Sequence, residues 1–214
     1  MHNITYTILE KCRRNLVPYT LKAFDTLPPF TAPRILDIGC GSGVQTLALM
    51  DHCEGSFDAA DIDTAALERL KSHARSLGYE NRLHIMNASV FDERIPRSSY
   101  DLVLAEGLLN AVGFEPGLNR LVELAKQHGY LILHDELKDD AWKRKLFTSL
   151  GLVLLESFEL NWGIWWKYYI KCLETALGQS EHPELMTEER DQIRLFRENP
   201  AQFSSVYYIL KWNW

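Results

Sequence analysis

The residue pattern with the clearest chemical meaning is the glycine-rich run DIGCGSG at residues 37–43. Glycines at alternate positions let the backbone turn sharply and approach a ligand without a side-chain clash. A helix that begins directly after such a turn offers N–H groups and a positive dipole end, which suit a carboxylate or a phosphate. Dinucleotide-binding turns use GxGxxG at this place. Here Val44 stands where that pattern needs its third glycine, which disfavours an NAD-dependent oxidoreductase.

Two further polar positions end the next two predicted strands. Asp61 lies about twenty residues beyond the glycines, where an acid can accept hydrogen bonds from both ribose hydroxyls of a nucleoside. A helix N-cap is the alternative role, but Asp63 is better placed for it. Asn87 and Ala88 end the following strand, where Asn87 either meets an adenine edge or occupies an ordinary turn. The pattern therefore predicts a nucleoside site along one edge of a sheet.

Four polar residues at the ends of later strands are candidates to face a second ligand. Glu106 and Asn110 follow the fourth predicted strand, and His134 and Asp135 follow the fifth. A histidine titrates near neutrality, so His134 is a candidate general base. A purely structural role is the alternative for a histidine at a strand end.

Aromatic residues gather in one later segment, WGIWWKYY at residues 162–169. One interpretation is an aromatic wall of an acceptor pocket that favours a cationic amine through cation–π attraction. The other is that these rings pack the segment onto the sheet. Trp165 and Tyr169, four residues apart, are expected on one helical face.

The elements that must position these residues alternate between short apolar strands and amphipathic helices. This alternation predicts an α/β fold with a parallel sheet covered by helices on both faces. The predicted strands are 34–38, 56–62, 82–87, 100–105 and 130–134, and the predicted helices are 44–52, 64–77, 116–128 and 140–150.

Both ends of the chain add to this core. Helical spacing over residues 4–24, broken near Pro18, predicts N-terminal helices within residues 1–30. Strands are predicted at 152–160 and 203–212, with a helical, aromatic-rich insertion at about 161–200 between them. We expect one domain over residues 1–214, in which the insertion forms part of the acceptor pocket.

Composition excludes several classes of protein. The 214 residues are 46% hydrophobic and carry a formal net charge of -6, which counts against nucleic acid as the main partner. The chain shows neither a signal peptide nor a membrane span, so a soluble cytoplasmic protein is expected. The four cysteines are far apart and predicted to be free thiols, and the scattered histidines predict no metal site. Oligomeric state is not predicted.

Five motifs stand in order between about residues 34 and 136: ILDIGCGSG, AADID before TAALERL, MNASVFD, SSYDLVLAEGLL and HGYLILHDE. Together they resemble class I S-adenosylmethionine-dependent methyltransferases. The segment AEGLLNAVGFEPGLNRL and the later WGIWWKYY are similar to a subgroup of small bacterial and archaeal methyltransferases of unassigned substrate. The resemblance implies a Rossmann-like three-layer α/β/α fold whose seven-stranded sheet is mostly parallel, with an antiparallel last strand.

The resemblance also implies a cofactor, S-adenosyl-L-methionine, and the residues that hold it. The glycine turn would line the methionine moiety with Asp37 near its amino group, Asp61 would hold the ribose and Ile62 would pack on adenine. Asn87 replaces the aspartate common in the family, which changes the expected hydrogen bonds there. Gln127-His128-Gly129 replaces the usual Pro-Gly-Gly. The implied cofactor set is Asp37, Gly39, Cys40, Gly41, Gly43, Asp61, Ile62, Asn87, Ala88 and Glu106.

Methyl transfer is an in-line displacement at a sulfonium carbon, so the protein mainly aligns the acceptor and excludes water. A small-molecule acceptor and N- or O-methylation are expected. Two alternatives stay open: a non-catalytic S-adenosylmethionine-binding module that acts through a partner, and a nucleic-acid or protein methyltransferase. The candidate catalytic residues are His134, Glu106 and Tyr169, and the candidate acceptor-binding residues are Asn110, Trp162, Trp165 and Tyr169.

Overall fold

The computed structural model describes residues 7–181, 184 and 186–213, and within these residues seven strands form one sheet. The strands are β1 (Arg34–Ile38), β2 (Ser56–Asp61), β3 (Leu83–Asn87), β4 (Tyr100–Glu106), β5 (Ala125–Glu136), β6 (Leu152–Leu160) and β7 (Ser205–Trp212). Their order is β3-β2-β1-β4-β5-β7-β6. The pairs from β3 to β5 are parallel, and β7 is antiparallel to both β5 and β6. The predicted fold class is confirmed.

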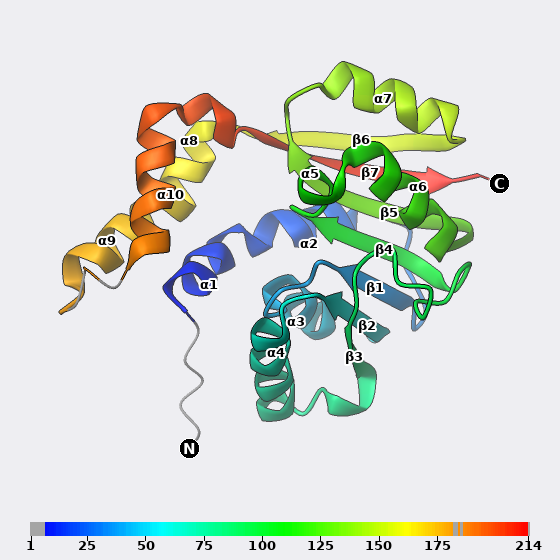
Figure 1. Ribbon diagram of the computed structural model, residues 1–214. Helices are drawn as coiled ribbons and strands as arrows, with labels where there is room; N and C mark the ends of the chain where they lie inside the picture. The colour runs from blue at the N-terminus through cyan, green and yellow to red at the C-terminus, as the bar shows by residue number, and fades with distance from the viewer. Residues whose placement is uncertain (1–6, 182–183, 185, 214) are drawn as a thin grey trace.

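Helices flank this sheet and extend beyond one of its edges (Figure 1). They are α1 (Ile8–Arg13), α2 (Val17–Asp25), α3 (Val44–His52), α4 (Thr64–Leu77), α5 (Leu109–Val112), α6 (Phe114–Leu124), α7 (Asp140–Ser149), α8 (Trp162–Trp165), α9 (Lys171–Gln179) and α10 (Thr187–Glu198). A π-helical turn, η3 (Trp166–Ile170), joins α8 to α9. Membrane-spanning segments were sought among the described residues, and none of their helices is both long and apolar enough.

Successive side chains of a strand point to opposite faces, and the central strands use both faces for the core. Ile35 and Leu102 belong to the apolar cluster on the side of α1 to α4. Their neighbours Leu36 and Val103 belong to the cluster on the side of α6 and α7. This double burial explains why the strands read as continuous apolar runs in the sequence.

Local signals set the helix ends, as α4 illustrates. The Asp63 side chain accepts hydrogen bonds from the N–H groups of Ala65 and Ala66, and so caps the first turn as predicted. Gly78 ends the helix with φ +75°, a left-handed conformation that glycine adopts without strain.

The predicted boundary between the helix at 116–128 and the strand at 130–134 is wrong. Residues 125–128 were expected to continue a helix, but α6 ends at Leu124 and Ala125 starts β5 by pairing with Tyr100. The register between β4 and β5 shifts after that pair, and Lys126 bonds Asp101 at 2.8 Å. Pairing with β4 thus overrides the local preference of this segment for helix.

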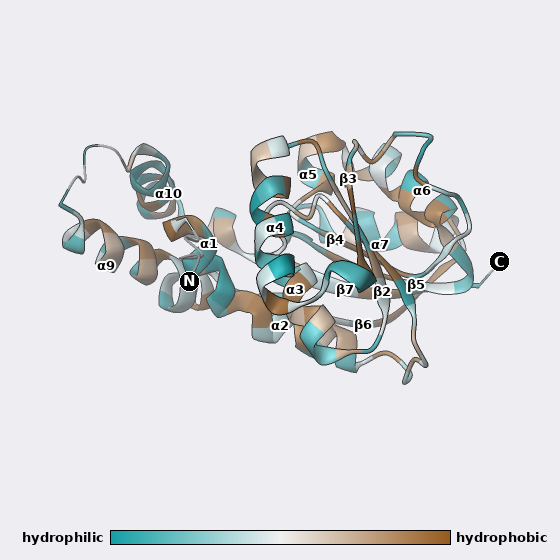
Figure 2. Ribbon diagram, turned by 90° about the horizontal axis from the view of Figure 1, so that it is seen from below, coloured by the Kyte–Doolittle hydropathy of each residue, from teal (hydrophilic) through white to brown (hydrophobic). Residues whose placement is uncertain are grey.

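The N-terminal helices and the insertion α8–α10 meet beside the carboxyl ends of the parallel strands (Figure 1). In both views, α9 and α10 stand beside the sheet rather than over either of its faces (Figure 2). Helix α1 also contacts the core, because Glu10 accepts a hydrogen bond from Arg69 of α4 at 2.8 Å. Residues 4–6, where the first helix was expected to begin, lie outside the described residues.

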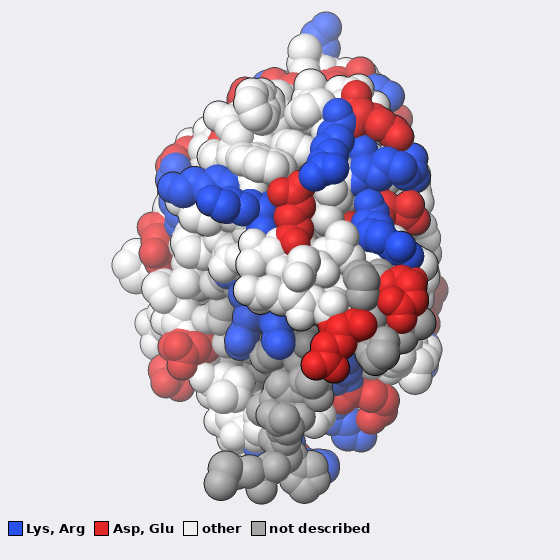
Figure 3. Space-filling view, turned by 90° about the vertical axis from the view of Figure 1, so that its left-hand side faces the viewer, with Lys and Arg blue, Asp and Glu red and all other residues white. Residues whose placement is uncertain are grey.

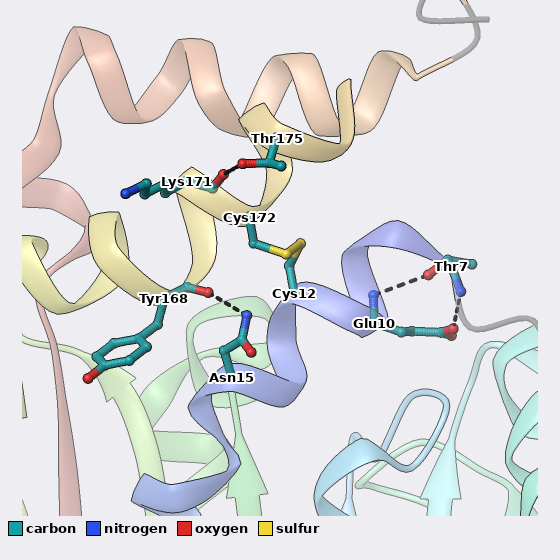
Figure 4. Close-up of a disulfide and its surroundings, with 8 residues drawn as sticks. All are labelled: Thr7, Glu10, Cys12, Asn15, Tyr168, Lys171, Cys172 and Thr175. Carbon is teal, nitrogen blue, oxygen red and sulfur yellow. Dashed lines mark hydrogen bonds between the residues drawn. A yellow bond between two sulfur atoms is a disulfide. The ribbon is translucent and has the colours of Figure 1, made fainter. Parts of the chain in front are cut away.

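A disulfide joins these two helical parts and corrects the prediction of four free thiols. Cys12 of α1 is bonded to Cys172 of α9 across a sequence separation of 160 residues (Figure 4). The adjacent Asn15 amide donates to the carbonyl oxygen of Tyr168 at 2.8 Å. Cys40 and Cys53 are free. The sequence gives no sign of this bond because its partners meet only in the folded chain.

A thiol count checks the disulfide. In denaturant without reductant, we expect two reactive thiols per chain, and four after reduction. Reduction or Cys12→Ser should lower the free energy of unfolding by about 2–5 kcal/mol, because the bond closes a long loop of the unfolded chain. Urea denaturation measures this loss. Four thiols in the unreduced protein would contradict the bond, and Cys53→Ser is the matched control.

Candidate functional site

The glycine turn connects β1 to α3 and is held against β2. The N–H groups of Gly39 and Cys40 both donate to the carbonyl oxygen of Ala60, at 2.8 and 3.2 Å. Gly41 N–H donates to the Asp61 carboxylate at 2.7 Å. Gly43 adopts φ +75° directly before α3. The turn therefore presents backbone rather than side chains at the carboxyl ends of β1 and β2.

Asp37 lies fully buried at the carboxyl end of β1, where its carboxylate accepts a 2.5 Å hydrogen bond from Thr46. Burial raises the pKa of this carboxyl to about 7, against the lowering effect of Thr46. Repulsion from Glu106 and Asp61 raises the pKa further. Three of the predicted site residues, Asp37, Asp61 and Glu106, are thus close enough for the charges of the other two to affect Asp37.

Asp61 is the last residue of β2, and the more exposed Ile62 follows it. One carboxylate oxygen of Asp61 receives Gly41 N–H and the other receives Asp63 N–H. Ile62 is 74% exposed, an unusual position for a large apolar side chain. The Asn87 amide donates to the carbonyl oxygen of Ile62 at 3.1 Å, so β3 fixes the backbone at this position.

The carboxylates of Asp37, Asp61 and Glu106 lie around the glycine turn. Within the described part of the chain, no Lys or Arg side chain forms an ion pair with Asp37, Asp61 or Glu106. Among the described residues, Glu106 lies within ion-pair distance of His134 alone, at 3.8 Å. This arrangement creates a negative potential around the glycine turn, which favours a positively charged ligand.

Glu106 ends β4 and is held by hydroxyl groups from two distant segments. Its Oε1 atom accepts hydrogen bonds from Thr20 of α2 at 2.7 Å and from Tyr207 of β7 at 3.1 Å. Its Oε2 atom faces Nδ1 of His134 on β5. These contacts fix the orientation of the carboxylate.

His134 stands in a stack of nearly parallel rings. Its centroid is 4.1 Å from that of Tyr207 and 6.1 Å from that of Trp165, with interplanar angles of 5° and 13°. Phe158 extends the stack on the far side of Tyr207. Trp165 of the insertion is therefore in ring contact with the residues around Glu106.

The remaining predicted residues lie in different surroundings. Tyr169 is buried against the edge of Trp165 as expected, and burial raises the pKa of its hydroxyl. Trp162 is 53% exposed, and Asn110 is exposed on α5. Asp135 is buried and accepts a hydrogen bond from Lys143 of α7 at 3.2 Å. The structure thus brings Glu106, His134, Trp165 and Tyr169 together, and it places Asp135 in an ion pair with α7.

The sequence analysis did not identify the hydroxyl groups that contact Glu106 and His134, which belong to Thr20, Ser205 and Tyr207. Ser205 and Tyr207 lie two residues apart on β7, so period-two alternation places them on one face. That alternation is a signal the sequence does contain. Thr20 lies on α2 with no comparable signal, because its contact with Glu106 spans 86 residues.

Comparison with known families agrees with this geometry. A family model described as a methyltransferase domain matches residues 31–190, more than half of the chain. This chain belongs to that methyltransferase domain family. The matched domain agrees with the methyltransferase motifs of the sequence and with S-adenosylmethionine as the cofactor that those motifs imply.

Individual relatives of this methyltransferase differ in what they act on. It is 34% identical over 101 residues to a malonyl-[acyl-carrier protein] O-methyltransferase from Magnetococcus marinus, a match that covers 46% of this chain and 36% of the relative. It is 29% identical over 133 residues to a tRNA1(Val) (adenine(37)-N6)-methyltransferase from Yersinia pestis, which covers 59% of this chain and 50% of the relative. The chain spans half or less of the length of these relatives.

Among solved structures, the fold is similar to that of the [4+2]-cyclase SpnF. The TM-score is 0.78 at 12% identity, and the alignment covers 92% of this chain and 81% of the cyclase. This likeness concerns the fold and not the chemistry.

Substitution of two glycines tests how tightly the turn is packed. In Gly43→Ala, the new Cβ would lie 2.2 Å from Cδ1 of Leu70, which is itself fully buried, so we expect a loss of about 2–4 kcal/mol in the free energy of unfolding. Gly41→Ala is the matched control, because Gly41 also has positive φ but has free space around it. Its loss should be about 1 kcal/mol. Equal losses in urea denaturation would contradict this account.

The raised pKa of Asp37 gives the free protein a defined pH dependence. The pKa is about 7 in the folded chain and 3.8 for the unperturbed group, so ionisation of Asp37 opposes folding. This penalty is absent below pH 4, grows between about pH 4 and pH 7, and stays constant above, at a few kcal/mol. Asp37→Asn keeps an acceptor for Thr46 and removes the penalty.

Stability curves of the variant and the wild type should therefore diverge as the pH rises from 4 to 7, with the variant the more stable above. Urea denaturation in a pH series measures the difference. Glu54→Gln, at a side chain that is 94% exposed, is the control and should follow the wild type. A constant offset between wild type and Asp37→Asn would contradict the assignment.

Proposed function

We propose that this methyltransferase transfers a methyl group from S-adenosylmethionine to a small-molecule acceptor, with N- or O-methylation as the chemistry. The observation that carries the proposal is the group of three carboxylates around the glycine turn, without a Lys or Arg partner among the described residues. S-adenosylmethionine brings a sulfonium and an ammonium group, so its charge fits this surrounding. When bound, it supplies an already activated methyl group.

The residues around the turn divide the cofactor between them. The backbone of Gly39, Cys40 and Gly41 would line the methionine part, with Asp37 as the partner of its ammonium group. Asp61 would hold the ribose hydroxyls. The exposed side chain of Ile62 offers apolar surface for the adenine ring.

Further contacts with the cofactor would come from the end of β3. Asn87 and Ala88 would border the adenine at the end of β3. In the structure Asn87 already donates to the carbonyl oxygens of Asp61 and Ile62, so its amide oxygen is the atom left for the ligand. Gly43 supports the turn.

The acceptor site is proposed at the carboxyl ends of β4 and β5, next to Glu106 and His134. Thr20 and Tyr207 hold the Glu106 carboxylate in place, so it can orient a cationic acceptor or accept a proton. Helix α2 and the insertion border this end of the sheet (Figure 1). On this view residues 1–214 act as one domain, in which Trp162, Trp165, Tyr169 and Asn110 form or border the acceptor pocket.

The charge distribution supports a small acceptor over a nucleic acid, despite the similarity to tRNA methyltransferases. Figure 3 shows basic and acidic side chains intermixed on the face that includes the insertion. Arg194 pairs with Asp191 and Glu198, and Arg197 pairs with Glu174. Arginines engaged in this way do not form a basic stripe for phosphates.

A cytoplasmic location is part of the proposal. The sequence is the basis for this location. The disulfide between Cys12 and Cys172 argues against it, because disulfides are uncommon in reducing compartments. The redox state of these two cysteines in protein isolated under thiol-trapping conditions tests the location.

Calorimetric titration with S-adenosylhomocysteine tests the cofactor site. Asp61→Ala should weaken binding at least about tenfold, because a hydrogen bond to a charged group contributes about 1.5–3 kcal/mol. Asp63→Ala removes a carboxylate two residues away that caps α4, and it should change affinity less than about threefold.

Each outcome of the titration is informative. Equal affinity in wild type and Asp61→Ala would move the nucleoside away from β2. An absence of binding by folded wild-type protein would overturn the proposed function. If binding is confirmed, methyl-labelled cofactor and a panel of small amines and hydroxyl compounds identify the acceptor, with a tRNA pool as the competing substrate.

A further inference from the structure

A single hydroxyl group connects the insertion to the histidine beside Glu106. Ser205 Oγ lies 3.0 Å from the indole Nε1 of Trp165 and 2.8 Å from Nε2 of His134. Within the described residues, these two nitrogens are the hydrogen-bond partners of this oxygen. Ser205 and His134 are both buried, so bulk water does not compete for these bonds.

The direction of the two bonds follows from what each group can do. An indole nitrogen only donates, so Trp165 donates to Ser205 Oγ. A serine hydroxyl has one hydrogen, and the partner left for it is Nε2 of His134. Nε2 then acts as an acceptor, and the ring proton of neutral His134 lies on Nδ1. Nδ1 lies 3.8 Å from Oε2 of Glu106, so this contact is electrostatic and longer than a hydrogen bond.

We propose that Trp165 and Ser205 are positioning residues that hold His134 in its Nδ1–H tautomer, and that His134 thereby stabilises the Glu106 carboxylate. The inference deepens the proposed function, on which it rests for the role of Glu106. It also changes the role expected for His134. With one ring nitrogen occupied by Ser205 and the other carrying a proton, His134 has no lone pair directed at an acceptor.

Glu106 is then the proton acceptor or cation partner at this site. Its Oε1 atom is held by the hydroxyls of Thr20 and Tyr207, and its Oε2 atom faces the His134 N–H. The nearly parallel rings of Tyr207 and Trp165 restrain the imidazole plane. The insertion thus contributes a bond that orients the imidazole beside Glu106, in addition to any surface it offers to an acceptor.

Nitrogen-15 NMR of the imidazole rings tests the proposal without cofactor or acceptor. Long-range proton–nitrogen spectra separate the two neutral tautomers and the charged ring. His134 should show the Nδ1–H pattern in the wild type, assigned by through-bond correlation and by its loss in His134→Asn. Trp165→Phe keeps an aromatic ring but removes the N–H, and Ser205→Ala removes the hydroxyl. In both variants, the Nε2–H form should become populated.

Trp162→Phe is the matched control, because this indole lies three residues from Trp165 on the same helix but is 53% exposed. It should leave the His134 signals unchanged. An Nε2–H pattern in the wild type, or a His134 spectrum identical in wild type and Trp165→Phe, would overturn the proposal. Binding of S-adenosylhomocysteine is measured separately, so failure of the cofactor site and failure of the tautomer assignment are told apart.

Discussion

The structure of the site depends on keeping negative charge at the carboxyl edge of the sheet. Asp37, Asp61 and Glu106 end three adjacent strands, β1, β2 and β4, and each is stabilised by neutral donors rather than by a cation. Neutral donors orient a carboxylate without cancelling its charge, so the field stays available to a ligand. Burial raises the pKa of Asp37, and repulsion from Glu106 and Asp61 raises it further.

The half of the site that we propose for the nucleoside was predictable from the sequence, because its residues lie at or directly after the ends of strands. Asp61 and Asn87 end two parallel neighbours, and parallel strands bring their carboxyl ends to the same edge. Helix α4 was predictable in the same way, from its cap at Asp63 and its end at Gly78. In α4, the residues that begin and end the helix interact with their immediate neighbours in sequence, so the sequence pattern is enough to predict them.

The other half depends on contacts that no local pattern contains. Glu106 was a candidate, but the hydroxyls that hold it come from positions 20 and 207. The partner of Cys12 lies 160 residues away, and spacing argued for free thiols instead. The strand start at Ala125 was missed for the same reason, since pairing with Tyr100 decides it. Similarity of fold does not fill this gap, because a cyclase shares the architecture at 12% identity.

Helix α1 is linked to two other parts of the structure, which restricts how far it can move. Glu10 fixes one side to Arg69 of α4, while Cys12 fixes the other to α9. A movement of α1 would therefore disturb both α4 and the insertion. An exchange of ligands that requires α1 to move therefore also requires the bond to Cys172 to open or α9 to move with it.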